Sequence, residues 1–250
     1  MKLSVPLAAT VAAALALSAC QKQADAEFGA KVRTYLLEHP EVLQEMAVKL
    51  REKEQLAQTT ASKAAVEKFR AQLERDPRDV VVNPAGSITV VEFFDFNCGY
   101  CKLVAPEVAK LVEENPDVRL VFKHFAFQTE DAVAAAKVAL TEPARPKALA
   151  LYRELMAQKP LNPAAIDRSL IAVGLDPAAT RTAAATPAIL KQIEDAHALA
   201  GELEIEGTPA FVVGDQIIHG ADIEALKTAV AAQRSGPLKR PPAAAPGSPT

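Results

Sequence analysis

Apolar residues follow two different periods along this chain, which predicts a domain built from both strands and helices. The run from Ile88 to Phe96 is almost continuously apolar, as expected for a strand that is buried on both faces. From Val104 to Val112 apolar residues recur at helical spacing, until Asn115-Pro116 ends the pattern. Further strands are predicted from Val80 to Val82 and from Val118 to Phe125.

The stretch between Thr129 and Glu206 carries no strand pattern and is rich in alanine and leucine. We expect four or five short helices there, inserted at about 129–205 into one domain. A capping residue followed by proline, which suits the first turn of a helix, occurs at Asn162-Pro163, Asp176-Pro177 and Thr186-Pro187.

Strand signals return after this insert. The segments Ala210 to Val213 and Gln216 to His219 predict a hairpin, with Gly214-Asp215 as its tight turn. A last helix is predicted from Asp222 to Gln233. The pattern therefore predicts one α/β domain over residues 79–234.

The region 28–78, in front of this domain, carries helical patterns. One begins at Phe28 and is interrupted at His39-Pro40, where the proline suits the first turn of a second helix. The pattern thins from Arg51 to Arg75, which predicts a long, mostly solvated helix that ends at Asp76-Pro77. Such helices cannot bury their apolar stripe alone, so they either pack on the main domain or assemble with copies of the chain.

The first residues are typical of a targeting segment. Met1-Lys2 gives a positive start, and Val5 to Leu17 is apolar but short for a helix that spans a bilayer. The sequence Leu17-Ser18-Ala19-Cys20 resembles the lipobox of bacterial lipoproteins, which implies a signal peptide over 1–19 and a lipid on Cys20. The alternative is an ordinary secretory signal cut near the same place, with Cys20 left as a free thiol.

Length, charge and composition narrow the function classes. A chain of 250 residues can hold one sizeable core and a small appended module. The net charge is −3, with both signs interspersed, and aromatic residues make up 5%, so nothing indicates binding to nucleic acid. Residues 20–27 are expected to be a polar connector, and residues 235–250, rich in proline and alanine, a disordered tail.

Two of the three cysteines lie in Cys98-Gly99-Tyr100-Cys101, at the junction of the predicted strand and helix. Backbone N–H groups at a helix start stabilise a thiolate, so we expect Cys98 to attack and Cys101 to resolve the mixed disulfide. Half of a zinc site and an inert buried pair are the alternatives. Structural zinc needs four ligands, and the chain has no second C-x-x-C and only scattered single histidines, so we expect no metal and no cofactor.

This order of elements resembles the DsbA-type branch of the thioredoxin superfamily. Three segments within residues 80–233 carry the resemblance: Val91-Glu92-Phe93-Phe94-Asp95-Phe96-Asn97-Cys98-Gly99-Tyr100-Cys101, Val121-Phe122-Lys123 and Gly207-Thr208-Pro209-Ala210-Phe211. It implies a thioredoxin-like fold with an inserted helical subdomain. It also implies a cis bond between Thr208 and Pro209, in a loop that lies against the sulfurs and pairs with an extended substrate peptide. A trans proline in a plain turn is the alternative.

Glu92 and Lys123 match the pattern of this family by position. Glu92 lies in an otherwise apolar strand, so it is a candidate for a buried carboxylate that relays a proton to or from Cys101, with Lys123 as its charge partner. The alternative is that both are strand-end charges that face solvent.

Two further features bear on the direction of the chemistry. Tyr35 to Leu43 resembles the helical extension of ScsC-like and Com1-like members, some of which trimerise, and trimers there go with disulfide isomerase activity. Gly99-Tyr100 stands where the strongest oxidants carry Pro-His, so no imidazole is present to stabilise the thiolate further. We expect a less oxidising pair, with a potential of roughly −130 to −230 mV.

These features predict an exported thiol-disulfide oxidoreductase or isomerase, lipid-anchored on the periplasmic side of a bacterial cell envelope. The expected partners are unfolded or misoxidised envelope proteins with cysteines, and a membrane redox partner that resets the disulfide. One alternative is a copper-binding or copper-tolerance protein that uses the same thiols, since thiolates suit Cu(I). Another is an envelope assembly protein whose helices act and whose redox domain is inactive.

Overall fold

The computed structural model describes residues 27–126 and 129–235. The predicted signal peptide, Cys20, most of the connector and nearly all of the predicted tail lie outside the described residues. The chain divides into two compact units, Met1–Thr59 and Thr60–Thr250. The second unit holds the sheet.

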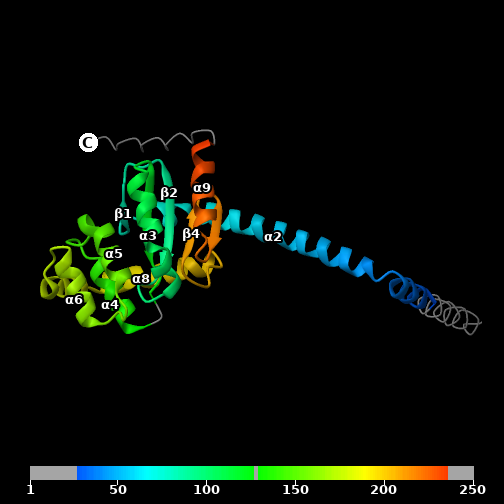
Figure 1. The fold of residues 1–250 in the computed structure, drawn as a ribbon, viewed down its shortest axis with the longest axis horizontal. Helices are drawn as coiled ribbons and strands as arrows, with labels where there is room; N and C mark the ends of the chain where they lie inside the picture. Colours follow the sequence, from blue (N-terminus) through cyan, green and yellow to red (C-terminus); the bar gives the residue numbers. More distant parts are fainter. Residues whose placement is uncertain (1–26, 127–128, 236–250) are drawn as a thin grey trace, which may run out of the picture. The chain divides into compact units, whose positions relative to one another are not determined.

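A five-stranded mixed sheet, in the order β1-β3-β2-β4-β5, organises the second unit (Figure 1). Its strands are β1 (Val80–Val82), β2 (Ile88–Phe94), β3 (Val118–His124), β4 (Ala210–Val213) and β5 (Gln216–His219). β2 and β3 are parallel and are connected through helix α3 (Gly99–Glu114), while the other neighbours are antiparallel. The predicted strands are confirmed, and Gly214, at φ +64, adopts the left-handed conformation that the tight hairpin turn requires.

The insertion between β3 and β4 is helical, as predicted. It contains α4 (Glu130–Ala139), a short 3-10 turn (Arg145–Lys147), α5 (Ala148–Ala157), α6 (Pro163–Ala172), α7 (Pro177–Ala184) and α8 (Pro187–Glu202). The Asn162 and Asp176 side chains cap α6 and α7 by accepting a backbone N–H, whereas Thr186 begins α8 without a side-chain hydrogen bond. A last helix, α9 (Ile223–Ser235), follows the hairpin.

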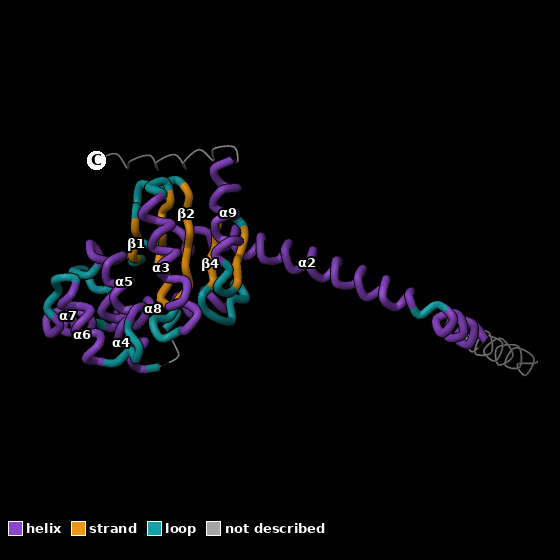
Figure 2. Tube along the Cα trace, in the orientation of Figure 1, coloured by secondary structure: helices purple, strands orange, loops and turns teal. Residues whose placement is uncertain are grey.

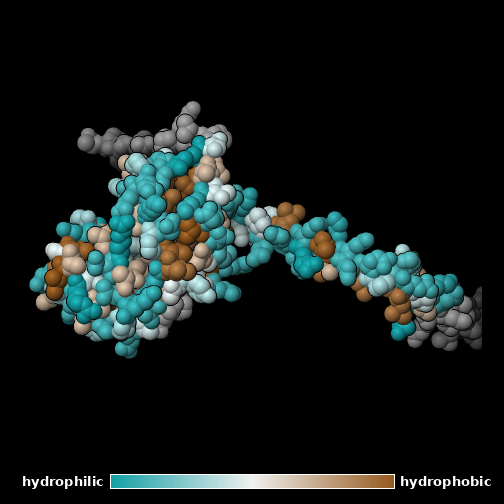
Figure 3. Space-filling model, viewed as in Figure 1, coloured by the Kyte–Doolittle hydropathy of each residue, from teal (hydrophilic) through white to brown (hydrophobic). Residues whose placement is uncertain are grey.

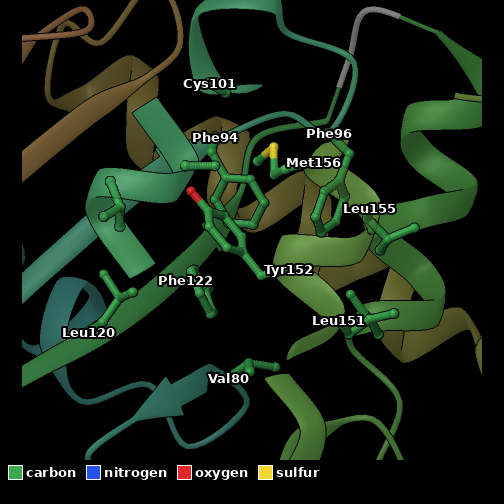
Figure 4. Close-up of a cluster of buried hydrophobic side chains, with 14 of the residues drawn as sticks. Val80, Phe94, Phe96, Cys101, Leu120, Phe122, Leu151, Tyr152, Leu155 and Met156 are labelled. Atoms are coloured by element: carbon green, nitrogen blue, oxygen red, sulfur yellow. The ribbon is translucent and has the colours of Figure 1, made fainter. Parts of the chain in front are cut away.

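The sheet is buried on both faces, which accounts for the continuous apolar runs of β2 and β3. On one face Phe94 and Phe122 pack with residues of α3, α5 and α9 (Figure 4). On the other face Phe93 and Val121 pack with α8 and with the end of α2 (Glu41–Glu74). Neighbouring residues of one strand therefore enter two separate cores.

The end of α2 is part of the second unit, although most of the helix from Arg51 to Arg75 is exposed, as predicted. Val66 and Leu73 are 0% and 1% exposed, and Phe69 packs beside them. These residues recur at helical spacing, so they form one apolar stripe that the sheet covers. The second compact unit begins within α2, at Thr60, so its core includes helix residues that precede the domain start predicted at residue 79.

The first unit is helical as far as it is described. A helix covers residues 27–38, and α2 begins after a break at His39-Pro40, as predicted (Figure 2). Apolar side chains alternate with hydrophilic ones along these helices (Figure 3). Several of them are exposed, among them Phe28 at 70%, Leu37 at 66% and Met46 at 60%. Exposure of this many large apolar residues in one unit is typical of an association surface.

Replacing Leu73 with alanine is expected to lower the free energy of unfolding of the second unit by about 2–4 kcal/mol, because the cavity opens in a closed core. Leu56→Ala, in the same helix, is the matched control, since Leu56 is 69% exposed. Denaturant unfolding followed by circular dichroism measures both. Equal, small losses in the two variants would contradict the placement of the α2 end in the core.

Candidate active site

Cys98 is the N-cap of α3, the position whose side chain can accept hydrogen bonds from the unpaired backbone N–H groups of the first helical turn. Cys98 has extended backbone angles, and its Sγ accepts a hydrogen bond from the Cys101 backbone N–H at 3.3 Å. The turn before it is fixed by Asp95, whose carboxylate accepts from Asn97 N at 2.6 Å and whose carbonyl accepts from Cys98 N at 3.1 Å. The chain therefore leaves β2 and enters α3 with the sulfur at the positive end of the helix.

The two thiols have opposite acid–base character. The thiol of Cys101 donates toward Cys98, and this hydrogen bond is the largest cause that lowers the pKa of Cys98, to about 5. Backbone N–H groups of Cys101 and Tyr100 act in the same direction. The same thiol–thiol hydrogen bond, together with burial, raises the pKa of Cys101. Cys98 is thus a thiolate at neutral pH while Cys101 stays protonated.

The loop predicted to lie against the sulfurs does so. The Thr208-Pro209 peptide bond is cis, and the Thr208 carbonyl oxygen lies 3.3 Å from Cys98 Sγ. A hollow of about 610 Å³ opens next to this loop, and Tyr100, whose side chain is 68% exposed, lines it. The lining residues are Tyr100, Thr208, His219, Gly220, Ala221, Asp222, Ile223 and Glu224. Gly99 is exposed, with open space around it.

Glu92 is buried, as predicted, but Lys123 is not its partner. Glu92 is 0% exposed, and its Oε1 accepts a hydrogen bond from the Tyr152 hydroxyl at 2.9 Å. Burial raises the pKa of Glu92 to about 8. In the sheet register Glu92 lies opposite Phe122, so the next residue, Lys123, points to the other face.

Lys123 instead forms a buried ion pair on the far side of the sheet. Its Nζ lies 2.5 Å from Asp79 Oδ2 and 2.6 Å from the backbone carbonyl of Gln72. Burial raises the pKa of Asp79 to about 6, although Lys123 opposes this shift. The prediction that Lys123 takes part in proton transfer at the cysteines is therefore wrong. Its place indicates a structural role, which is to tie the end of α2 to β3.

Sequence reasoning missed Tyr152 and Asp79, the residues that accompany the two buried charges. A lysine in a buried strand requires an acidic partner, but the pattern does not tell which of the many carboxylates supplies it. Tyr152 lies in a helix whose apolar face predicts only burial. Both pairings join segments far apart in sequence, and only the fold brings them together.

The described residues contain no group of three or more His, Cys, Asp or Glu side chains that could hold a metal ion. His124 is buried among phenyl rings, and neither of its ring nitrogens has a hydrogen-bond partner among the described residues. Burial lowers the pKa of His124 to about 3. Cys98 and Cys101 are both free thiols. Cys20 lies outside the described residues.

Comparisons with known families match the chain in two places. A model of the DSBA-like thioredoxin domain matches residues 89–231, and a model of the copper resistance protein ScsC N-terminal domain matches residues 25–57. The two matches fall on either side of the unit boundary at Thr60.

Solved structures agree with this division. A thioredoxin-like oxidoreductase from Silicibacter pomeroyi is 36% identical, with a TM-score of 0.63, over 67% of this chain and 99% of that one. ScsC from Proteus mirabilis, in a transitional conformation, is 29% identical, with a TM-score of 0.63, over 87% of this chain and 98% of that one. The second match extends beyond the thioredoxin-like domain.

A curated relative is much longer than this chain. The Na(+)/H(+) antiporter NhaA 3 of Salinispora tropica is 31% identical over 172 residues, which are 66% of this chain. The chain spans only 26% of the length of that antiporter. None of the described helices of this chain combines the length and apolar character needed to cross a membrane.

In the reduced protein, alkylation of Cys98 is expected to titrate with a midpoint near pH 5, which iodoacetamide labelling as a function of pH measures. Since the folded pKa is below the unfolded value of 9.0, this thiolate contributes stability that is present above pH 9 and is lost as pH falls through 5. Cys101→Ala should raise the midpoint, because the Cys101 thiol is the largest cause of the shift. A wild-type midpoint near 9 would contradict the geometry.

Proposed function

The chain belongs to the family of DsbA-like thioredoxin domains, and we propose that it is an exported thiol-disulfide oxidoreductase that acts on cysteines of cell-envelope proteins through Cys98-Gly99-Tyr100-Cys101. The observation that carries this proposal is the asymmetry of the two sulfurs. The pKa of Cys98 is lowered to about 5 and that of the buried Cys101 is raised. Cys98 is the nucleophilic thiolate, and Cys101 stays a thiol until a mixed disulfide has formed at Cys98.

The chemistry can run in either direction. In oxidation, a substrate thiolate attacks Cys98 Sγ of the Cys98-Cys101 disulfide, and Cys101 leaves as a thiolate that takes up a proton. A second substrate thiolate then releases Cys98, and the substrate gains a disulfide while the enzyme gains two electrons. In isomerisation, the Cys98 thiolate attacks a substrate disulfide and is released when the substrate bonds rearrange. Glu92, which is buried and protonated at neutral pH, is the proposed proton donor and acceptor for Cys101.

The N-terminal helices are the proposed assembly region, through which chains form a trimer. Residues 25–57 match the ScsC N-terminal domain, and this unit exposes large apolar side chains. An assembly that holds several Cys98 sites can retain one misfolded substrate while its disulfides are reshuffled. This supports isomerisation as an activity of the assembled protein, whereas a single domain acts mainly as an oxidant.

Copper binding is a second candidate, because the matched N-terminal family is described as part of a copper resistance protein. Two thiolates suit Cu(I). The raised pKa of Cys101 opposes this function, since a metal ligand has to lose its proton. Thiol exchange requires this asymmetry and therefore fits the geometry better.

The proposed location is the periplasmic side of a bacterial cell envelope. The lipobox-like sequence ending at Cys20 supports a lipid anchor there. The proposed partners are unfolded or misoxidised envelope proteins and a membrane protein that resets the redox state. The transport activity of the antiporter relatives is no part of the proposal, since this chain spans 26% of their length.

Refolding of a scrambled disulfide protein tests the function, with oligomeric mass measured alongside. The full chain is expected to be trimeric and to restore native disulfides, and Cys98→Ala to be inactive. A chain that starts at Thr60 retains its core and should exchange thiols normally, but should lose isomerase activity by about tenfold or more.

A chain that starts at Thr60 is preferable to one that starts at Arg78, because the later start would remove Val66 and Leu73 from the core. Equal isomerase activity with and without the helices would refute the role of assembly. An inactive full chain that binds one Cu(I) tightly would favour the copper function.

Mass spectrometry of the mature N-terminus tests the anchor. We expect a chain that begins at Cys20 and carries the added mass of lipid, and Cys20→Ser should release the protein from membranes without changing thiol exchange. An unmodified terminus after residue 20 would contradict the anchor and favour an ordinary secretory signal.

A further inference from the structure

The buried carboxyl of Glu92 receives its hydrogen bond from the helical insertion. Tyr152, on α5, donates its hydroxyl to Glu92 Oε1 at 2.9 Å, and the two side chains are 2% and 0% exposed. The other carboxyl oxygen, Oε2, is also buried and has no hydrogen-bond partner among the described residues. We propose that Tyr152 is the positioning residue of Glu92, and that it orients the carboxyl for proton transfer with Cys101. This inference rests on the proposed function.

The Tyr152 ring is held by the aromatic cluster of the core, so its hydroxyl has a fixed position. The ring stacks on Phe122 with centroids 4.9 Å apart and meets the edge of Phe94 at 5.3 Å. Figure 4 shows Tyr152 among Phe94, Phe96 and Phe122. A phenol packed on several sides cannot follow the carboxyl if the carboxyl turns. The hydrogen bond therefore selects one orientation of Glu92.

This orientation suits the proton step. A protonated carboxyl has one oxygen that only accepts and one that carries the proton, and the tyrosine donor satisfies the accepting oxygen, Oε1. The proton then resides on Oε2. When Cys101 leaves as a thiolate, the O–H bond at Oε2 breaks, and an intervening water molecule accepts this proton while it donates one of its own to Cys101 Sγ, so that Glu92 becomes a carboxylate. The tyrosine hydrogen bond is then charge-assisted, so it strengthens as the negative charge appears. The reverse step returns the proton to Oε2.

The ionisable groups around Glu92 come from three elements. The start of α3 supplies its N-cap Cys98 and Cys101, and α5 supplies Tyr152. Burial is the largest cause that raises the pKa of Glu92 and of Tyr152, and charge on Cys98 and on Cys101 adds to these two shifts respectively. β3 supplies His124, which lies on the same face as Glu92 because it pairs with Phe94, two residues further along β2. Burial lowers the pKa of His124 to about 3, so its imidazole is neutral. The partner of Glu92 on β4 is Phe211, which does not ionise. His124 is neutral and Phe211 does not ionise, so the pH dependence of proton transfer at Cys101 reports on Glu92 and the two thiols.

Tyr152→Phe removes the hydroxyl and keeps the ring. The test is the pH dependence of the rate at which Cys101 resolves a mixed disulfide between Cys98 and glutathione, measured in the full chain. The hydrogen bond stabilises the carboxylate, so its loss should move the Glu92 inflection upward by about one pH unit and slow the step by about tenfold at neutral pH. The alkylation midpoint of Cys98 should stay close to that of wild type. In a Glu92→Gln background, Tyr152→Phe should add no further effect.

Leu151→Ala is the matched control, since Leu151 is a buried neighbour on α5 that carries no hydroxyl. It should lower stability and leave the inflection in place. An unchanged inflection in Tyr152→Phe, or an equal shift in Leu151→Ala, would overturn the proposal.

Infrared spectroscopy gives an independent readout. The carbonyl band of protonated Glu92, identified by its loss in Glu92→Gln, should lie at the frequency of a hydrogen-bonded acid and shift in Tyr152→Phe. A wild-type band at the frequency of a free acid would overturn the proposal without any variant of Tyr152. A wild-type chain without exchange activity would refute the proposed function, and the infrared shift would then decide the orientation of the carboxyl alone.

Discussion

The hydrogen bonding at Cys98 Sγ is the interaction on which the rest of the site depends, and it exists because α3 starts at Gly99. Were the helix to begin one turn later, the N–H of Cys101 would be bonded within the loop and the sulfur would lose its donor. The start is fixed from outside the motif, by the turn that Asp95 makes after β2. The reactive cysteine is thus positioned by a strand end, a turn and a helix start that are adjacent in sequence.

The two-sided sheet adds a second constraint, because it separates charges that are neighbours in the chain. Phe122 and Lys123 are consecutive, yet one contributes to the core around the cysteines and the other to the core that holds the end of α2. The lysine ammonium is kept away from the active site in this way. Glu92 stays protonated because its burial raises the pKa of the carboxyl, and no cationic side chain of the described residues offsets this shift. The protonation state of the carboxyl therefore depends on burial and on the strand register that places Lys123 on the other face.

The local parts of this picture could be predicted from the sequence, and the long-range pairings could not. The strand before Cys98, the helix after it, the hairpin at Gly214-Asp215 and two of the proline-marked helix starts follow from periods and caps that lie within a few residues. The partners of Glu92 and Lys123 depend on which faces meet after folding, and a buried charge does not reveal its partner. The sequence left open, for the same reason, whether the end of α2 packs on the main domain or on a copy of the chain. Its stripe of Val66, Phe69 and Leu73 is sparse, and whether a sparse stripe is covered depends on a surface elsewhere in the chain.

The edges of the sheet carry a consequence for a protein whose proposed clients are incompletely folded. An extended client chain can add itself to any sheet edge that offers a row of unpaired backbone groups. Here the edge strands are β1, with three residues, and β5, with four, and β5 ends in the exposed polar residues Gln216 and His219. Edge strands this short offer few backbone hydrogen bonds, so a client chain that pairs with them gains little binding free energy. The fold thereby lowers its own risk of co-aggregating with the chains it encounters, and contact through the thiol site remains the favoured one.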